Sequence, residues 1–285
     1  MSLSRENTTV SYLEPSSAFA ELEGMRVHYT REGPNSPAAT IVLLHGSGSS
    51  LHIFNAITAQ LARQLEVIRL DLPGFGLTGP CPDRDYTIEA YVRLLDRFLE
   101  AHTSGRVILA GHSLGGRIAW TYALEHADRL SGLVLMNATG YPEKSVPLAL
   151  RLPRNPFLRP ILRRFGSRRA TAQNLRGIVG PGSSAVDDAM IDRVHALMSR
   201  PGNRSAFIDF ANTDQRDRSG EIRTITTPTL VLRSDLIDGQ HFARDIAGSR
   251  EVVLAGVGHL MPAEAPAAVS DAITGFLPTI THRSR

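Results

Sequence analysis

The sequence has little of the chemistry that covalent or metal-built folds require. It contains one cysteine, Cys81, in 285 residues, so an internal disulfide framework and a metal site of several thiolates are both excluded. None of the ten histidines forms a pair with acids at the helix or turn spacing of a metal site, and we expect no metal. The glycine-rich loop that follows the expected strand Thr40–Leu44 carries neither of the phosphate-cradling patterns G-x-x-x-x-G-K-[ST] and G-x-G-x-x-G.

Targeting and membrane signals are absent too. The first twenty residues hold no apolar stretch of the length found in secretory signals, and no apolar run approaches the roughly 20 residues that span a bilayer. We therefore expect a cytoplasmic protein without stable membrane insertion.

Charge of either sign is not in excess. The chain carries 31 basic and 28 acidic residues, a net charge of +3. This balance, without a recognised binding module, argues against nucleic acid as a partner. A composition with 42% hydrophobic and 21% charged residues is that of an ordinary globular protein and excludes a disordered, collagen-like or coiled-coil chain.

Expected strands and helices alternate along most of the chain, which predicts a mostly parallel sheet covered on both faces. Helices are expected near 53–64, 87–102, 113–126, 241–246 and 263–276. The eight expected strands are Ala18–Leu22, Met25–Arg31, Thr40–Leu44, Leu65–Asp71, Arg106–Ala110, Leu130–Met136, Pro228–Leu232 and Glu251–Ala255.

The alternation stops between residues 139 and 218, where no buried strand is expected. We assign this stretch to a helical insertion that acts as a cap, and we assign 1–138 and 219–285 to one core domain. The segment Arg151–Arg169 has seven arginines and no acidic residue. It favours a solvated amphipathic helix with its apolar side over a pocket; the alternative is a surface that recruits anionic substrates or a membrane.

The segment Gly111–Gly116, which reads Gly-His-Ser-Leu-Gly-Gly, follows an expected strand and opens a helix. In such a G-x-S-x-G turn the serine is held in a strained conformation, and small residues two positions before and after it allow close backbone approach. The free N–H groups of the helix N-terminus face developing negative charge. We interpret Ser113 as a nucleophile; the alternative is an ordinary helix N-cap.

A serine hydroxyl needs a base whose pKa lies near neutrality, which favours a histidine. His259 is the best placed, because it lies between the last expected strand and a helix that begins after Pro262, at the edge where parallel sheets bind ligands. We interpret His45 and His112, which adjoin other motif residues, as structural. The other seven are expected at the surface or partly buried: His28, His52, His102, His126, His195, His241 and His282.

The imidazole in turn needs a carboxylate that fixes its tautomer. In chain order this acid is expected between Ser113 and His259, just past the strand Pro228–Leu232. Asp235 and Asp238 are both candidates. We prefer Asp235, because Asp238 is better placed to cap the following helix.

A glycine-rich loop, His45-Gly46-Ser47-Gly48, directly follows the expected strand Thr40–Leu44. Glycines there let the backbone approach a substrate and point N–H groups inward. We expect the backbone N–H groups of Ser47 and Leu114 to form an oxyanion hole; the alternative is a turn with no such role.

Four segments together resemble motifs of the α/β-hydrolase family, in the family's order: Leu43–Ser50, Asp71–Thr78, Gly111–Gly116 and Gly256–Pro266. The resemblance implies an α/β-hydrolase fold, with a mostly parallel eight-stranded sheet flanked by helices and a helical cap. By strand distance, the family's acid would fall near Ile237, between the two candidates.

The resemblance and the residues together predict a serine esterase, a carboxylic ester hydrolase that also fits lactones and needs no cofactor. Its expected partner is a small hydrophobic ester, and the oligomeric state stays open between monomer and homodimer. Epoxide hydrolases and haloalkane dehalogenases carry aspartate where this chain has Ser113, which argues against both. One alternative is a carbon–carbon bond hydrolase of ring-cleavage products, although that branch usually has asparagine at the position of His112. The other is a non-catalytic ligand-binding protein on a hydrolase fold.

Overall fold

The expected strands all form, and they build one eight-stranded sheet. The computed structural model describes residues 12–142, 152–160 and 166–281. The strands are β1 (Ser17–Leu22), β2 (Met25–Glu32), β3 (Thr40–Leu44), β4 (Glu66–Leu70), β5 (Val107–His112), β6 (Leu130–Met136), β7 (Thr229–Ser234) and β8 (Arg250–Leu254). Their order is β1-β2-β4-β3-β5-β6-β7-β8. β2 is antiparallel to both of its neighbours and every other pair is parallel, which confirms the mostly parallel sheet.

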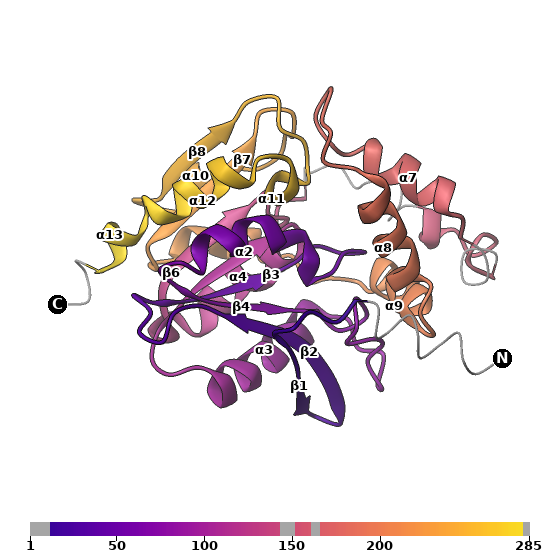
Figure 1. The fold of residues 1–285 in the computed structure, drawn as a ribbon, viewed down its shortest axis with the longest axis horizontal. Coiled ribbons are helices and arrows are strands. Elements are labelled where there is room, and N and C mark those ends of the chain that lie inside the picture. The colour runs from indigo at the N-terminus through magenta and orange to yellow at the C-terminus, as the bar shows by residue number, and fades with distance from the viewer. Residues whose placement is uncertain (1–11, 143–151, 161–165, 282–285) are drawn as a thin grey trace.

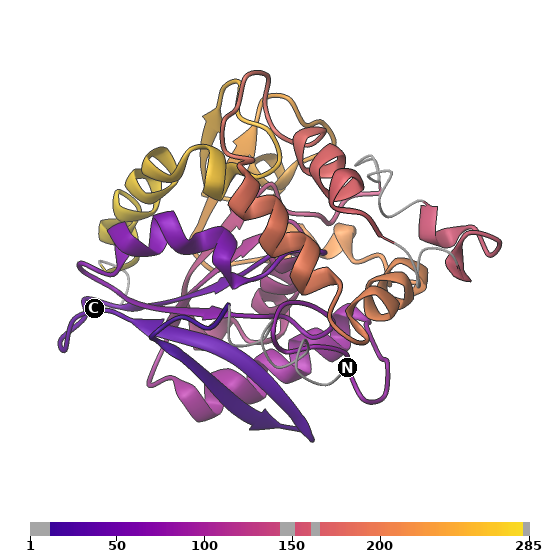
Figure 2. The same ribbon diagram turned by 45° about the vertical axis from the view of Figure 1, so that its right-hand side comes forward.

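Helices cover both faces of this sheet (Figures 1 and 2). The core helices are η1 (Leu51–Phe54), α2 (Asn55–Leu61), α3 (Ile88–His102), α4 (Leu114–Glu125), η2 (Ala127–Arg129), α10 (Phe242–Asp245), α11 (Met261–Glu264), α12 (Pro266–Thr274) and α13 (Leu277–Thr281). α2 packs with α12 and α3 packs with α4. In α3 the Thr87 side chain accepts a hydrogen bond from the Ala90 N–H, so Thr87 caps the start of this helix.

Alternation along the central strands separates two hydrophobic cores. In β3, Val42 and Leu44 face the core that contains α3 and α4. Ile41 and Leu43 face the core that contains α2 and α12. Because successive side chains of a strand point to opposite faces, apolar residues at every position produce a strand buried on both sides.

Two expectations near the C-terminus are wrong. The helix expected over 263–276 is split into α11 and α12 at Ala265, because Pro266 disfavours a helical conformation in the residue before it; Ala265 has φ −136° and ψ 53°. The N-cap of α10 is His241, so Asp238 does not cap that helix.

The stretch between β6 and β7 is helical where it is described, without a strand among those residues. It contains η3 (Leu152–Arg154), α7 (Arg168–Arg176), α8 (Asp188–Met198), α9 (Asn203–Asn212) and η4 (Ser219–Thr224). The Ser167 hydroxyl accepts a hydrogen bond from the Ala170 N–H, and the Asp187 carboxylate accepts one from the Met190 N–H, so side chains cap α7 and α8. These helices lie beside the sheet at one side of the molecule (Figure 1). We refer to residues 139–218 as the insertion.

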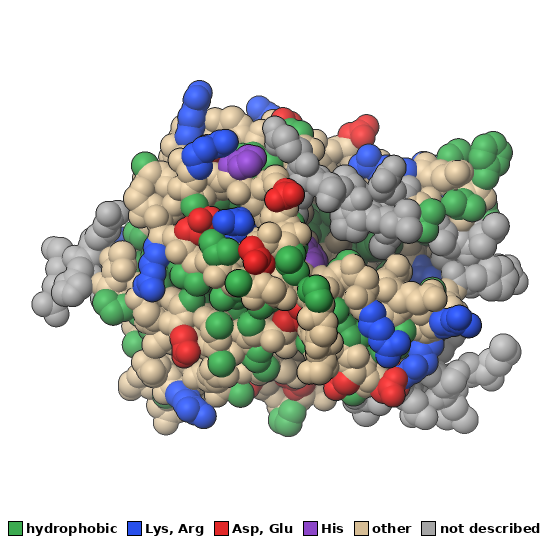
Figure 3. Space-filling view, turned by 90° about the horizontal axis from the view of Figure 1, so that it is seen from above, with side chains coloured by type: hydrophobic (Ala, Val, Ile, Leu, Met, Phe, Trp, Pro, Cys, Tyr) green, Lys and Arg blue, Asp and Glu red, His purple; other side chains and the backbone are tan. Residues whose placement is uncertain are grey.

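Several arginines of the insertion make contacts within it. Arg168 forms ion pairs with Asp188 and Asp192 of α8, and Arg154 donates to the carbonyl of Ala211. Charges of both signs are interspersed on the face seen in Figure 3. Within the described ranges, none of the helices combines the length and hydrophobicity needed to traverse a bilayer. The helix predicted over Arg151–Arg169 lies partly outside the described residues. In the described part, the short η3 is followed by a turn at residues 155–158, so the prediction of one helix over this segment is wrong.

Candidate active site

Ser113 occupies the sharp turn between β5 and α4. Its backbone has φ 54° and ψ −112°, a strained conformation for a residue with a side chain. A Cβ at Gly111 would lie 2.2 Å from the Gly115 carbonyl oxygen, and one at Gly115 would lie 2.0 Å from that of Leu44. Close packing therefore requires glycine two positions before and after the serine, as predicted. Ser113 is the N-cap residue of α4 by position, but among the described residues its hydroxyl makes no capping hydrogen bond to that helix.

Ser113 and His259 line the same pocket, a cavity of about 70 Å³. The core domain contributes the glycine-rich loop, the turn after β5 and the loop after β8. The insertion contributes α7, α8 and the segment between them. The lining residues are Gly46, Ser47, Gly48, Ser49, Ser50, Ile53, His112, Ser113, Leu175, Ile178, Met190, Arg193, Val194, His259 and Leu260. The pocket thus lies between the core and the insertion.

The main chain of His259 is held from three sides. Its carbonyl oxygen accepts hydrogen bonds from His112 Nε2 at 2.7 Å and from Asn137 Nδ2 at 3.2 Å. Its N–H donates to the carbonyl of Ile178, in the insertion, at 2.6 Å. The rings of His112 and His259 have centroids 4.8 Å apart. The residue before Ser113 and the residue that follows β6 therefore both fix the position of His259.

The two candidate acids lie in different surroundings, and both are exposed. Asp235 Oδ1 accepts a hydrogen bond from the Gly256 N–H at 2.8 Å, which ties this carboxylate to the loop that carries His259. Asp238 instead lines a second, separate pocket near α10. Within the described part of the chain, neither aspartate forms a hydrogen bond or ion pair with His259. The choice of Asp235 as the orienting acid stays a prediction.

The glycine-rich loop packs directly against the candidate nucleophile. A Cβ at Gly46 would lie 3.1 Å from Cβ of Ser113. The Gly115 N–H donates to the His45 carbonyl, which joins this loop to the first turn of α4. In the described residues, the backbone N–H groups of Ser47 and Leu114 make no hydrogen bond, so both are available to a bound oxyanion.

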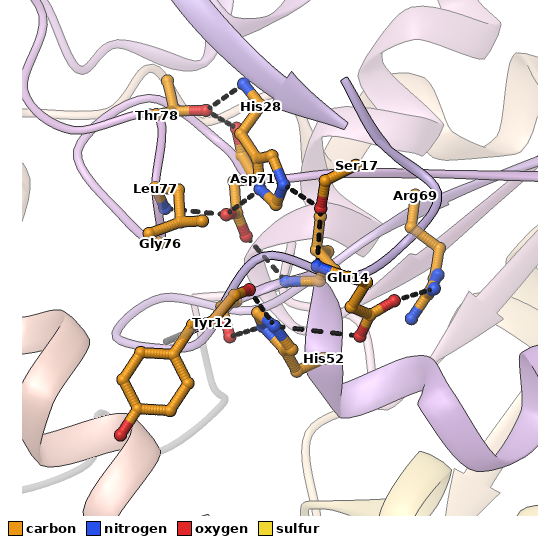
Figure 4. A network of polar contacts seen from close by, with 12 residues as sticks. Tyr12, Glu14, Ser17, His28, His52, Arg69, Asp71, Gly76, Leu77 and Thr78 are labelled. Carbon is orange, nitrogen blue, oxygen red and sulfur yellow. Dashed lines mark hydrogen bonds and ion pairs between the residues drawn. The ribbon is translucent and has the colours of Figure 1, made fainter. Parts of the chain in front are cut away.

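A network of polar contacts surrounds a buried carboxylate, that of Asp71 (Figure 4). Asp71, which follows β4, is fully buried. It accepts hydrogen bonds from the N–H groups of Leu51 and Leu77 and from His28 Nδ1, each at 2.7 Å. Burial alone would raise the pKa of Asp71, but the His28 hydrogen bond and the neighbouring histidines lower it to about 2. Asp71 is therefore an ionised structural group that holds the start of η1 in place.

His45 continues this network toward the pocket. Its Nε2 accepts a hydrogen bond from the Leu72 N–H at 2.9 Å, so Nδ1 carries the proton and donates to the Gly46 carbonyl at 2.7 Å. Burial lowers the pKa of His45 despite the opposing effect of Asp71, which favours this neutral tautomer. The contacts support the structural interpretation of His45.

Two histidines expected at or near the surface are buried, so that expectation is wrong. His28 bridges Asp71 and the Ser17 hydroxyl, the latter at 2.8 Å. His52 accepts a hydrogen bond from the Ser50 hydroxyl, and its Nε2 donates to the Tyr12 carbonyl. Asp71 is the signal in the sequence that could have indicated the burial of His28. A carboxylate at the end of a buried strand needs buried donors, and β2 supplies His28 directly beside it.

A basic residue also lines the same pocket, and the sequence did not single it out. Arg193 on α8 is half-buried and lines the pocket with Ser113. Burial lowers its pKa, while the charges of Asp187 and Glu14 oppose that effect; a guanidinium nevertheless stays charged. Among the described residues it makes no hydrogen bond or ion pair. Clusters of three or more side chains that could hold a metal ion are not found in the described ranges.

Comparison with known proteins gives a consistent result. A family model described as alpha/beta hydrolase fold matches residues 39–266. An uncharacterized hydrolase, YugF, of Bacillus subtilis is 27% identical over 90% of this chain and 96% of its own length. A 2-hydroxy-6-oxononadienedioate/2-hydroxy-6-oxononatrienedioate hydrolase of Cupriavidus pinatubonensis is 30% identical over 73% of each chain. A thermophilic esterase from Thermogutta terrifontis superposes with a TM-score of 0.76 at 25% identity, covering 93% of this chain and 98% of that one.

Proposed function

Because the chain belongs to the alpha/beta hydrolase fold family and is a hydrolase of that fold, we propose that it is a serine hydrolase of carboxylic esters, including lactones. The observation that carries the proposal is the presence of Ser113, in its strained turn, in one pocket with His259. Acyl transfer needs a hydroxyl, an imidazole and donors for the oxyanion; Ser113, His259 and Ser47 line this cavity, and Leu114 directly follows Ser113.

The proposed reaction has two steps. The Ser113 oxygen attacks the ester carbonyl carbon while His259 takes its proton, and the tetrahedral intermediate collapses when the protonated imidazole returns that proton to the leaving alcohol. Water, deprotonated by His259, then cleaves the acyl-enzyme and releases the acid. The N–H groups of Ser47 and Leu114 stabilise the oxyanion in both steps, and one such donor typically contributes about 3–4 kcal/mol.

The insertion serves as the cap of this site in our proposal. Leu175, Ile178 and Met190 place apolar side chains on the pocket wall, which suits a hydrophobic acyl or alcohol group. Arg193 is the exception on that wall, and it suits a substrate with a carboxylate away from the reacting carbonyl.

Arg193 also supports a second candidate, hydrolysis of a carbon–carbon bond in an acidic ring-cleavage product. The relative from Cupriavidus pinatubonensis carries the name of a hydrolase of dienedioates and trienedioates, which are anionic. We prefer ester hydrolysis because it requires no protein groups beyond Ser113, His259 and the backbone N–H groups of Ser47 and Leu114.

Paired assays test the proposal. Purified protein is offered p-nitrophenyl esters of increasing acyl length and, separately, a 2-hydroxy-6-oxo-dienoate. We expect turnover of the short esters, lost in Ser113→Ala. Turnover of the dienoate without turnover of any ester would replace the first candidate by the second, and turnover of neither would reject both.

A further inference from the structure

Glu264 connects the insertion to the loop that carries His259. It lies at the end of α11, and its Oε2 accepts two backbone hydrogen bonds. One comes from the Gly258 N–H at 3.0 Å and the other from the Gly180 N–H at 2.7 Å. Gly258 directly precedes His259. Gly180 lies two residues after Ile178, whose carbonyl accepts the His259 N–H. One carboxylate oxygen therefore joins both segments that flank the candidate base.

The two bridged segments are in backbone contact, so neither Gly180 nor Gly258 could carry a side chain. A Cβ at Gly258 would lie 2.3 Å from the Gly180 nitrogen, and one at Gly180 would lie 2.0 Å from the Gly256 carbonyl oxygen. Because the two segments lie so close together, the N–H groups of Gly180 and Gly258 can both donate to Oε2 of Glu264. Charge-assisted hydrogen bonds to a carboxylate are shorter and stronger than neutral ones, which suits Glu264 to hold both amides at once.

The second oxygen of Glu264 makes the carboxylate depend on this bridge. Oε1 is buried and has no hydrogen-bond partner among the described residues. An unsatisfied buried oxygen is costly, and the two bonds at Oε2 offset that cost only while both donors stay in place. Movement of the insertion away from the core would break the Gly180 bond and the Ile178 bond together.

We propose that Glu264 is a positioning residue, which sets the backbone of His259 relative to Ser113 and couples that position to the closed placement of the insertion. The proposal rests on the proposed function, because it takes His259 as the base. Glu264 does not touch the substrate. Its effect is transmitted through the N–H of Gly258 on one side and through the Gly180–Ile178 segment on the other.

The test compares three variants at this position. Glu264→Gln keeps an acceptor oxygen at the same distance from the main chain but has no charge. Glu264→Asp keeps the carboxylate on a side chain that is one methylene shorter. Glu264→Ala removes both the acceptor oxygen and the charge. Since small misplacements of catalytic groups can cost up to about 100-fold in rate, we expect at least about a 10-fold loss of kcat on a p-nitrophenyl ester in the Ala and Asp variants. KM should stay within about 3-fold, and Gln should recover most of the activity.

Glu125→Ala is the matched control. It removes a glutamate whose ion pair with Arg218 also joins a core helix to a later segment, but Glu125 does not line the pocket. We expect kcat close to that of the unmodified protein. If Glu264→Ala does not fold, the Asp and Gln variants decide the question between them.

Amide hydrogen exchange separates this proposal from the proposed function, because it needs no activity. Peptides that contain residues 178–180 and 256–259 should exchange faster in Glu264→Ala and Glu264→Asp and nearly normally in Glu264→Gln. Unchanged exchange in all three would overturn the bridge. Faster exchange with unchanged kcat, or a Gln variant as slow as the Ala variant, would overturn the positioning role. Failure of the unmodified protein to react at Ser113 would instead reject the proposed function.

Discussion

The imidazole of His112 donates from Nε2 to the main-chain carbonyl of His259 over 2.7 Å. The residue before the candidate nucleophile thus holds the candidate base, although 147 positions separate the two in the sequence. His112 is 2% exposed, and its ring also packs against that of His259. The strained turn after β5 therefore positions both partners of the proposed proton transfer.

Loss of this donor should slow the reaction. In His112→Leu the His259 carbonyl loses its 2.7 Å hydrogen bond while that from Asn137 stays, and we expect kcat on a short ester to fall about 10-fold or more, as for other misplaced catalytic groups. His112→Gln retains a side-chain N–H donor, so its kcat should lie between that of His112→Leu and that of the unmodified protein. Steady-state kinetics of both variants, with circular dichroism to check folding, measure the effect. A Leu variant as fast as the unmodified protein would show that this bond is dispensable.

The choice of orienting acid can be tested by charge alone. In Asp235→Asn the amide oxygen can still accept from the Gly256 N–H, so only the charge is lost. We expect kcat to fall by about 100-fold or more, in the range that removal of the charge of a triad acid can produce. Asp238→Asn is the matched control and should be close to normal, because Asp238 lines the other pocket. The reverse pattern would assign the role to Asp238.

The cation in the pocket predicts a preference for anionic substrates. We expect Arg193→Met to lower kcat/KM for p-nitrophenyl hemisuccinate by about 10- to 100-fold, in line with the loss of a charge-assisted contact. Hydrolysis of p-nitrophenyl butyrate, which is similar in size but neutral, should change little. Arg176→Met is the control, because Arg176 is exposed on α7 and is not part of the pocket wall. Equal losses on both esters would contradict a carboxylate-binding role.

Asp71 should make stability fall in acid. Its pKa of about 2 in the folded protein lies below the ordinary value of 3.8, so the folded state binds this proton more weakly than the unfolded state. The shift corresponds to about 2 kcal/mol of stability that is fully present above roughly pH 5 and is lost as the pH falls toward 2.

Urea unfolding at several pH values measures this dependence. Asp71→Asn should destabilise the protein by about 3–5 kcal/mol at neutral pH, because the variant leaves buried partners uncompensated. It should also flatten the acid limb of the stability curve. An unchanged acid limb in Asp71→Asn would mean that other carboxylates produce it.

Local signals in the sequence were enough to predict the sheet and its strands. Each central strand is a short apolar run bounded by turn residues, and Gly111 and Gly115 mark the close approach around Ser113. The histidine after β8 follows from the same logic, because ligands bind at the carboxyl ends of parallel strands.

The rest depends on contacts between distant segments. Arg193 reaches the pocket only through the packing of α8 against the core, and Glu264 bonds to Gly180 across 84 positions. The burial of His28 required pairing of β2 with β4. No local period or spacing encodes such contacts, so composition and motif analysis could not assign these residues.

The central claim is that Ser113 is the nucleophile activated by His259. Intact-protein mass spectrometry after treatment with a fluorophosphonate, followed by peptide mapping, tests it most directly. We predict one phosphonyl group, located on Ser113, no label in Ser113→Ala, and labelling at least about 100-fold slower in His259→Ala, since the serine then lacks its base. Label on another serine, or equal labelling of Ser113→Ala and the unmodified protein, would contradict the account.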